Sequence, residues 1–477
     1  ELIFRLIMQY TKSKLPIQRL WLQSMTAESI REAFRQLRTD EDLQSLANAA
    51  RCRSEADWLV GINGTRAMTA FNSKDGGFFL TTVGRVQTPS LSILVDREDL
   101  IRRFQAKTYF EITAGFDTGS EQYLGKWFDP GFSKSDDNSD ARADRLWERK
   151  KADAVMASLS AGMSAKVSEE TKPSSQSAPM LFDLTSLQRE ANARFGFSAK
   201  ASLGLTQALY EKHKAVTYPR TDSKALPEDY IETVINCFKG LSKIPDYKPF
   251  ASQLIAEKRV IPNKKIFNNA KISDHFAIFP TGQIPKSLTE PEAKIFDLIV
   301  RRSLAVFFPA AEFLNTTRIS EISSNFFKTE GKVLKSAGWM AVYGKTIDEQ
   351  PFLPPLPAGQ GIVLASHELH ELQTKPPPRY SEATLLSAME GAGRFVDDEE
   401  KRDAMSGKGL GTPATRAAII EELIAKQYVV REGRELTPTA KAFQLMTLLR
   451  GLGVDSLSKA ELTGDWEFKL KEIELGQ

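Results

Sequence analysis

The most informative stretch of the sequence is a tyrosine followed directly by proline and arginine: Val216-Thr217-Tyr218-Pro219-Arg220-Thr221-Asp222-Ser223. A tyrosine hydroxyl is a poor nucleophile at neutral pH, because its ordinary pKa is about 10. It attacks phosphorus when a neighbour lowers that pKa or accepts its proton, and when a cation stabilises the charge that grows on the phosphoryl oxygens. In an extended chain, residues i and i+2 point to the same side. The Arg220 guanidinium is therefore expected beside the phenol, where its fork can hold two phosphate oxygens. The alternative is a strand end in which Tyr218 packs and Arg220 is solvated.

A second unusual segment surrounds a histidine: Ser273-Asp274-His275-Phe276-Ala277-Ile278-Phe279-Pro280-Thr281. The chain has only four histidines, and this one lies among apolar residues. A histidine that titrates near neutrality can donate to a phosphate oxygen or move a proton. The alternative is a core histidine that only satisfies its own hydrogen bonds.

A third segment is rich in glycine and precedes an apolar helix: Gly407-Lys408-Gly409-Leu410-Gly411-Thr412-Pro413-Ala414-Thr415-Arg416. Exposed backbone N–H groups at such a helix start can hold phosphate. Lys408 is followed by Gly409 rather than Ser or Thr, so the segment is not a Walker A loop and implies no nucleoside triphosphate.

Two shorter patterns carry charge. Gly84-Arg85-Val86-Gln87-Thr88-Pro89 offers Arg85 and Gln87 beside a glycine turn, although it also suits an ordinary helix entry. Arg53 and Asp57 stand four residues apart on an expected helix, which allows an ion pair. His367 and His370 are three apart in a strand-like stretch. They therefore lack the i, i+4 spacing of a metalloprotease helix and are expected to face solvent.

The bulk composition is that of a soluble globular protein. At 477 residues the chain should hold three or four domains, and its 41% apolar and 26% charged residues are ordinary. We find no signal peptide and no apolar run long enough to span a membrane. Cys52 and Cys237 are too few for a Cys-rich zinc site and are expected to be free thiols in a reducing compartment. The net charge of +3 does not by itself prove a nucleic-acid partner.

The expected elements alternate between helical and strand-rich regions, which suggests domains inserted into one another. The opening Glu1-Leu2-Ile3-Phe4 reads as the interior of a helix and suggests a fragment. Candidate helix starts are Thr26, Thr185 and Ser198, with a break at Gly196. We expect helices over 1–60 and 380–426, and strands over 108–133 and 320–372. A mobile loop is expected over 133–145, an extended connector over 163–180 and a Pro-rich link at 351–357. Residues 428–437 are expected to form a winged-type hairpin.

Taken in order, these segments resemble the type IA DNA topoisomerases, and most of all the bacterial topoisomerase III branch. Further motifs that carry the resemblance are Trp58-Leu59-Val60-Gly61-Ile62-Asn63 with Thr65-Arg66-Ala67, Leu181-Phe182-Asp183-Leu184, Leu187-Gln188-Arg189-Glu190-Ala191-Asn192, and Pro377-Pro378-Arg379-Tyr380-Ser381-Glu382-Ala383. The resemblance covers nearly the whole chain.

The resemblance implies a multidomain α+β torus, with helical domains that include winged-helix-like (CAP-like) parts and a strand-rich gate arch. It implies that Tyr218 forms a 5′-phosphotyrosyl bond, that Arg220 holds the scissile phosphate and that His275 bonds this phosphate in the transition state. It places further residues on or near the DNA strand: Arg53, Asp57, Arg85, Gln87, Gln188, Arg379 and Thr415.

The resemblance also implies a division of the chain and a cofactor. The expected parts are a Toprim remnant (1–15), a helical DNA-binding domain (16–107 and 371–477), a strand-rich gate domain (108–180 and 286–370) and a catalytic tyrosine domain (181–285). The family's Toprim domain binds Mg²⁺ through an acidic cluster, and we expect those ligands, like the zinc-ribbon tail of many relatives, to be missing from this fragment.

The implied activity is ATP-independent cleavage, strand passage and religation, which relaxes negative supercoils or decatenates DNA. The expected partners are single-stranded and negatively supercoiled DNA, without a membrane, and the protein is expected to be a monomer in the bacterial cytoplasm, associated with the nucleoid. One alternative is a single-stranded-DNA-binding body without catalysis, because the acidic cluster is absent. Another is a tyrosine recombinase, which joins tyrosine to the 3′ phosphate and uses two arginines.

Overall fold

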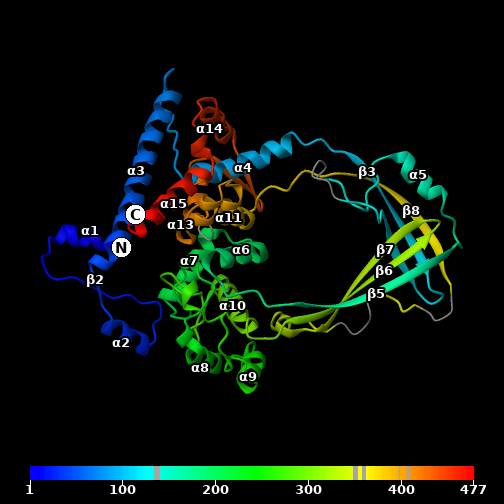
Figure 1. The fold of residues 1–477 in the computed structure, drawn as a ribbon, viewed down its shortest axis with the longest axis horizontal. Helices are drawn as coiled ribbons and strands as arrows, with labels where there is room; N and C mark the ends of the chain where they lie inside the picture. The colour runs from blue at the N-terminus through cyan, green and yellow to red at the C-terminus, as the bar shows by residue number, and fades with distance from the viewer. Residues whose placement is uncertain (134–139, 348–352, 357–360, 397, 406–408) are drawn as a thin grey trace. The chain divides into compact units, whose positions relative to one another are not determined.

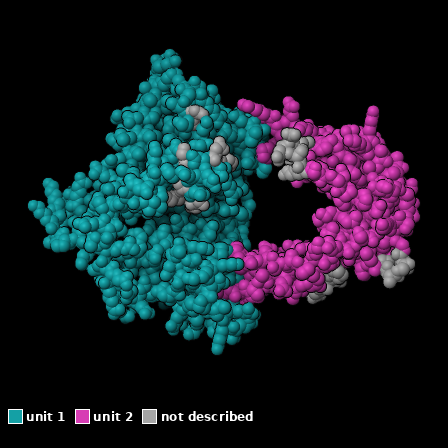
Figure 2. Space-filling view, in the orientation of Figure 1, with its two compact units in different colours: residues 1–102, 180–306, 378–477 teal, residues 103–179, 307–377 magenta. Residues whose placement is uncertain are grey.

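The computed structural model describes residues 1–133, 140–347, 353–356, 361–396, 398–405 and 409–477, and these residues divide into two compact units (Figures 1 and 2). Unit 1 comprises residues 1–102, 180–306 and 378–477, and unit 2 comprises residues 103–179 and 307–377. The second strand-rich segment was expected to begin at 286. It begins later, because residues 290–305 form a helix that packs in unit 1 against the helices spanning 184–195 and 199–211.

Unit 1 is mainly helical. Its helices are α1 (Leu2–Thr11), α2 (Ala27–Arg35), α3 (Gln44–Asn72), α4 (Gln87–Arg102), α6 (Leu184–Phe195), α7 (Ala199–Glu211), α8 (Ile231–Leu241), α9 (Lys248–Ala256), α10 (Glu290–Ala305), α11 (Glu382–Glu390), α12 (Glu399–Ala404), α13 (Pro413–Ala425), α14 (Ala440–Gly451) and α15 (Glu461–Glu474). Short 3-10 turns are η1 (Glu41–Leu43), η2 (Glu228–Tyr230), η3 (Asn269–Lys271), η5 (Ala392–Phe395) and η6 (Asp455–Ser458). Its strands form two antiparallel pairs, β1 (Gln18–Arg19) with β2 (Arg38–Thr39), and β9 (Val429–Glu432) with β10 (Glu435–Pro438), the hairpin expected over 428–437.

The helix starts follow from capping side chains. Thr26 and Ser198 cap α2 and α7 as expected, and Gly196 ends α6 with a φ of 72°. The expectation for Thr185 was wrong. Asp183 caps α6, its carboxylate accepting the Ser186 N–H at 2.7 Å. A carboxylate at this position satisfies a free N–H and also suits the positive end of the helix dipole.

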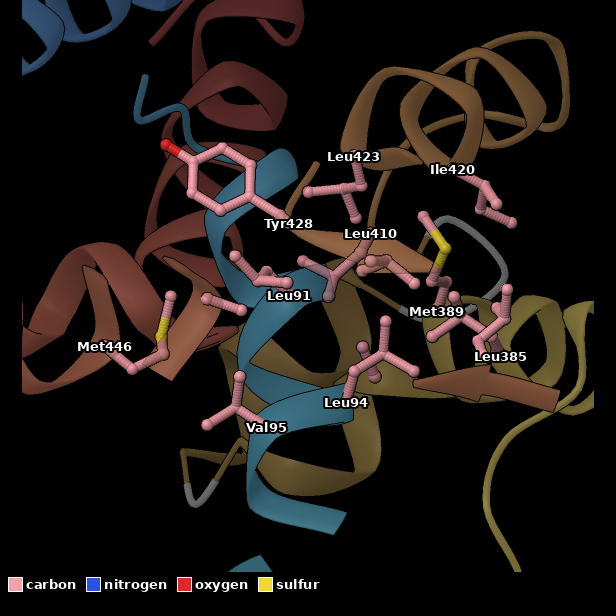
Figure 3. Close-up of a cluster of buried hydrophobic side chains, with 14 of the residues drawn as sticks. Leu91, Leu94, Val95, Leu385, Met389, Leu410, Ile420, Leu423, Tyr428 and Met446 are labelled. Carbon is pink, nitrogen blue, oxygen red and sulfur yellow. The ribbon is translucent and has the colours of Figure 1, made fainter. Parts of the chain in front are cut away.

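A hydrophobic core of unit 1 lies between α4, α11, α13 and α14 (Figure 3). Leu91, Leu94 and Val95 of α4 are at most 2% exposed. They face side chains from the other three helices, among them Met389 and Leu423. Each fully buried aliphatic side chain of this kind contributes roughly 1.5–3 kcal/mol of transfer free energy. This core fixes the helical body on which the Gly409–Arg416 segment is mounted.

Unit 2 is a closed antiparallel sheet in the order β3-β4-β7-β6-β5-β8. The strands are β3 (Thr108–Asp117), β4 (Gln122–Phe128), β5 (Ser164–Gln176), β6 (Ala311–Ile322), β7 (Asn325–Ser336) and β8 (Ile362–Gln373), with α5 (Arg149–Ala157) packed on β3 and β8 and the turn η4 (Gly338–Tyr343) beside β6. Its core includes the fully buried Ile112, Phe116 and Phe327.

Several expectations for unit 2 need correction. Residues 164–176 are not a connector but a strand, because they pair with β6 from Lys166 to Gln176. His367 and His370 lie in β8 as expected, yet both are half-buried, and a ring nitrogen of His370 lies 2.8 Å from the Thr113 hydroxyl. Residues 134–139 of the expected loop, and 351, 352 and 357 of the Pro-rich link, lie outside the described residues.

Among the residues that the structure describes, no helix combines the length and the apolar character that crossing a bilayer requires. Cys52 is exposed and Cys237 is buried, and both are free thiols. Burial raises the pKa of the Cys237 thiol to about 12, so this group is protonated at neutral pH.

Candidate active site

Tyr218 lies in an extended segment that follows α7 and runs against residues 276–281. Val216 forms an isolated antiparallel bridge with Pro280. The Thr217 N–H donates to the Phe279 carbonyl at 2.9 Å, and the Thr217 hydroxyl accepts from the Phe279 N–H at 2.9 Å. These bonds tie the two segments together and leave the neighbouring Tyr218 ring half-buried, with Pro219 buried behind it.

The structure brings Tyr218 and His275 into contact. Their ring centroids lie 4.3 Å apart with an interplanar angle of 47°. The Thr221 hydroxyl donates to the His275 carbonyl at 2.7 Å, which holds the histidine backbone beside the tyrosine segment. The His275 side chain is itself exposed. A half-buried phenol beside an exposed imidazole is an arrangement that a phosphate can approach from solvent.

Arg220 lies on the same side as Tyr218, because both contact one face of α7. The exposed Arg220 side chain donates from Nη2 to the side-chain amide oxygen Oε1 of Gln207 at 3.3 Å. Tyr210, three residues further along α7, meets the Tyr218 ring edge to face at a centroid distance of 5.4 Å. Residues three apart on a helix share a face, so the expectation that Tyr218 and Arg220 point the same way agrees with the geometry.

Sequence reasoning missed the α7 residues that contact this segment. Gln207 links Arg220 to Glu211, since its Nε2 donates to the Glu211 carboxylate at 2.8 Å. The available signal was the spacing of Gln207, Tyr210 and Glu211, which places all three along one helical face a few residues before Tyr218.

The Gly-rich segment touches the tyrosine segment through a buried arginine. Arg416 is 1% exposed and donates to the Thr185 hydroxyl at 2.9 Å and to the Leu410 carbonyl at 3.2 Å. Burial lowers the pKa of Arg416, and the carboxylates of Glu390, Asp183 and Asp222 oppose that shift. The N–H of Leu184, beside Thr185, donates to the Thr221 carbonyl at 3.0 Å. Arg416 therefore connects α13 to the start of α6 and, through it, to the loop that carries Tyr218.

The expected phosphate cradle over Gly407–Thr415 has a different geometry. Gly407 and Lys408 lie outside the described residues. The N–H groups of Gly409 and Leu410 donate to the carbonyls of Met405 and Met389, and the Thr412 N–H donates to the Thr415 hydroxyl at 3.0 Å. These three donors are consumed within the protein, so they do not form an anion cradle. Thr415 remains exposed at the start of α13.

Arg53 and Asp57 do not pair with each other as their spacing suggested. Arg53 forms a two-bond ion pair with the buried Glu467 of α15 at 2.7 and 2.5 Å. Asp57 accepts from Arg85 at 2.7 and 3.1 Å. Arg85 is 6% exposed and also lies against Trp466 at 5.0 Å. Each arginine therefore pairs with a carboxylate from another element, which offers better geometry for two hydrogen bonds than an i, i+4 neighbour does. The guanidinium of Arg85 lies between the carboxylates of Asp57 and Glu467.

The other residues that were expected to contact DNA differ in their exposure to solvent. Gln188 is fully buried, and its amide donates to the Ala199 carbonyl at 3.0 Å between α6 and α7. Gln87 is half-buried. Arg379 forms a two-bond pair with the buried Glu98 at 2.7 and 3.1 Å, which lowers the pKa of that carboxyl. Their contact with DNA stays a prediction.

The Mg²⁺ that the resemblance implies does not fit the residues at hand. A hard divalent cation takes several oxygen ligands at once. Over the described ranges, no three His, Cys, Asp or Glu side chains gather closely enough to hold a metal ion.

Comparison with known proteins identifies the family to which this chain belongs. The family model described as DNA topoisomerase matches residues 41–477, so the chain belongs to the DNA topoisomerase family, in the type IA class that its motifs resemble.

The particular relatives are bacterial. The chain is 38% identical over 491 residues to DNA topoisomerase 3 of Bacillus subtilis (strain 168), and 36% identical over 491 residues to DNA topoisomerase 3 of Bacillus cereus (strain ATCC 14579). Each alignment covers 100% of this chain and 64% of the relative, so the chain spans less than two thirds of their length. Full-length topoisomerase I from Thermotoga maritima shares the fold, with a TM-score of 0.71 and 22% identity over 99% of this chain and 72% of that one.

Proposed function

We propose that this chain is the strand-cutting body of an ATP-independent type IA topoisomerase that acts on single-stranded or negatively supercoiled DNA. The observation that supports this most is the contact between the Tyr218 and His275 rings at 4.3 Å, beside the exposed Arg220. A nucleophile, a hydrogen-bond donor and a guanidinium on one solvent-facing site suit attack on a phosphodiester. We further propose that the protein works as a monomer in the bacterial cytoplasm, in association with the nucleoid.

The proposed reaction exchanges one phosphate ester for another. The Tyr218 hydroxyl oxygen attacks phosphorus and forms a new O–P bond. The bond from phosphorus to the DNA O3′ breaks, the electron pair stays on O3′, and this oxygen takes up a proton in place of the one that the phenol loses. Arg220 holds two non-bridging oxygens and His275 donates to one, so charge that develops there is stabilised. The reverse step reseals the strand, and no external energy is needed because the two esters are similar.

The first prediction concerns the nucleophile. Tyr218→Phe should abolish covalent capture of a labelled single-stranded oligonucleotide, measured on a denaturing gel, because the attacking oxygen is gone. Tyr210→Phe is the matched control: it keeps the neighbouring ring that meets Tyr218 edge to face and should retain the adduct. The unaltered chain, assayed under the same conditions, should form the adduct and is the reference for both variants.

The outcome also separates the enzyme classes. An adduct that persists in Tyr218→Phe would show that another residue is the nucleophile. Labels at the 5′ and 3′ ends report the polarity of the bond. A tyrosine joined to the 3′ phosphate would favour recombinase-like chemistry over the 5′ linkage proposed above.

A second candidate is a body that binds single-stranded DNA without cutting it. It is favoured by the absence of a three-ligand acidic group within the described part of the chain. Supercoiled plasmid and Mg²⁺ distinguish the two candidates, because relaxation by this chain requires catalysis, whereas binding without relaxation is the result expected of the binding body.

A further inference from the structure

Three consecutive apolar side chains lie exposed in the turn that follows α3. Phe78, Phe79 and Leu80 are 77%, 56% and 50% exposed. Burial of such side chains is the main favourable contribution to folding, and large aromatic side chains grouped on a surface commonly mark a binding site. Phe71, at the end of α3, is also exposed and adds a further ring to the same region.

The turn is held in a fixed conformation. Gly76 and Gly77 have φ values of +109° and +81°, which favour glycine. The Phe79 N–H donates to the Ser73 hydroxyl at 2.9 Å, and the Thr81 N–H donates to the Thr69 hydroxyl at 3.0 Å. The Phe79 ring packs closely over Gly77. Because hydrogen bonds hold the backbone on both sides of the rings, the turn loses little conformational entropy when a ligand binds.

Two hollows flank the exposed rings, and both are lined by Phe78 and Leu80. One, of about 350 Å³, is completed by α3 residues that include Thr65 and Arg66. The other, of about 420 Å³, is completed by the end of α3 and by α14, including Lys441. These two helices lie beside each other in Figure 1. Rings that project between two hollows leave space for flat groups to pack on them.

Three basic residues lie near the exposed rings, and one acidic residue, Asp75, stands in the same turn. Arg66, Lys74 and Lys441 form no ion pair with a carboxylate anywhere in the described part of the chain. Lys74 lies 4.9 Å from the Phe71 ring, and Lys441 donates to the Lys426 carbonyl at 2.9 Å. In both hollows the described lining residues include no Asp or Glu. By contrast, the guanidiniums of Arg53 and Arg85 are neutralised by carboxylates.

We propose that Phe78 and Phe79 stack unpaired bases of single-stranded DNA, while Arg66, Lys74 and Lys441 hold its phosphates. Exposed aromatic rings interleaved with uncompensated cations are the combination that binds single strands, because every base has a face that can stack and every nucleotide carries a negative charge. This Phe78–Phe79 platform rests on the proposed function and adds a place where the strand is held, built from residues other than those around Tyr218.

Binding of fluorescein-labelled oligo-dT, followed by anisotropy, tests the platform with the chain as it is. Phe78→Ala/Phe79→Ala should weaken oligo-dT binding by about tenfold or more, because each lost stacking contact is worth a several-fold change in affinity. An abasic oligonucleotide of the same length has phosphates but no bases, and its affinity should not change. Phe34→Ala, which removes a 60% exposed phenylalanine on α2, is the matched control and should leave oligo-dT binding intact.

Phe79→Trp supplies a direct signature of stacking. The variant should retain affinity, and its additional fluorescence should be quenched by oligo-dT and not by the abasic oligonucleotide. A ring that served only the fold would give no such difference between the two ligands.

The possible outcomes distinguish failure of the Phe78–Phe79 platform from failure of the proposed function. If the unaltered chain binds no single-stranded DNA, both fail. If it binds and the double alanine variant binds equally well, only the platform fails. Equal losses for oligo-dT and the abasic oligonucleotide would overturn stacking. Self-association in sedimentation that Phe78→Asp abolishes would overturn the DNA assignment in favour of a second copy of the chain.

Discussion

The Glu98 carboxylate shows how one buried charge depends on its partner. It is 4% exposed on α4 and is held by two hydrogen bonds from Arg379. Hydrogen bonding to Arg379 lowers the pKa of Glu98 below its ordinary value of 4.5, with burial opposing the shift. A carboxylate whose pKa is lower in the folded state stabilises the fold above the ordinary pKa. That contribution is lost as pH falls through the lowered value.

Arg379→Gln should therefore reduce the free energy of unfolding most at neutral pH. The deficit should shrink as pH falls below about 4.5, because protonated Glu98 no longer needs the guanidinium. Urea unfolding of unit 1 at a series of pH values measures this. Arg51→Gln is the control, since the Arg51–Glu55 pair on α3 is exposed and such pairs contribute about 0–1 kcal/mol. Parallel curves for the unaltered chain and Arg379→Gln would contradict the prediction.

For individual residues, the sequence predicted which side chains suit the chemistry better than it predicted which side chains form pairs. Tyr218 and His275 stood out because their types and local patterns suit phosphoryl transfer, and the fold puts their rings in contact. Arg53 and Asp57 stood out through their spacing, yet each takes its partner from another element. Such partners are set by which helix packs against α3, and spacing along one helix carries no information about that.

Two glycines, one before α13 and one between β9 and β10, have the same backbone conformation but differ in how closely other atoms pack against them. Gly409 has a φ of +62°, and a Cβ there would lie 2.3 Å from the Met389 carbonyl oxygen. Gly433, in the turn between β9 and β10, has the same φ of +62°, but a Cβ there would meet nothing within 4 Å. The two positions share backbone strain and differ in packing.

Gly409→Ala should lower the free energy of unfolding by roughly 2–5 kcal/mol, the sum of left-handed backbone strain and a steric clash. Gly433→Ala should lower it by only about 1–2 kcal/mol, from strain alone. Chemical denaturation of both variants measures the difference. Equal losses would show that α11 moves aside and that the close approach at Gly409 is unimportant.

Elements with strong local signals were predictable, and those that depend on distant partners were not. Thr26, Ser198 and Gly196 mark helix ends as expected. The start of α6 at Asp183 was missed because Thr185 offered a similar pattern two residues later. The strand β5 was taken for a connector because it is polar and contains Pro173. It becomes a strand only because β6, far along the chain, pairs with it.

In the molecule as a whole, each of the two units has a hydrophobic core of its own. One lies in unit 1 around Leu91 and the other in unit 2 around Phe327. Because each unit buries its own apolar side chains, each should unfold as its own cooperative unit.

Phe327→Ala should destabilise unit 2 by about 3–5 kcal/mol, and Leu91→Ala should destabilise unit 1 by about 2–5 kcal/mol, through lost burial and the cavity left behind. Hydrogen exchange read by mass spectrometry should show faster exchange confined to the unit that carries the substitution. Faster exchange across both units in either variant would mean that the chain unfolds as one body.

The ion pair between Arg53 and Glu467 joins residues 414 positions apart. On a ribosome that adds about 5–20 residues per second, α3 waits roughly 20–80 s for the helix that carries its partner. The strands of unit 2 are all synthesised before that helix, since β8 ends at Gln373. The nascent chain can thus complete its sheet while the helical unit is still unfinished, and during this interval the α15-facing side of α3 is open to chaperones.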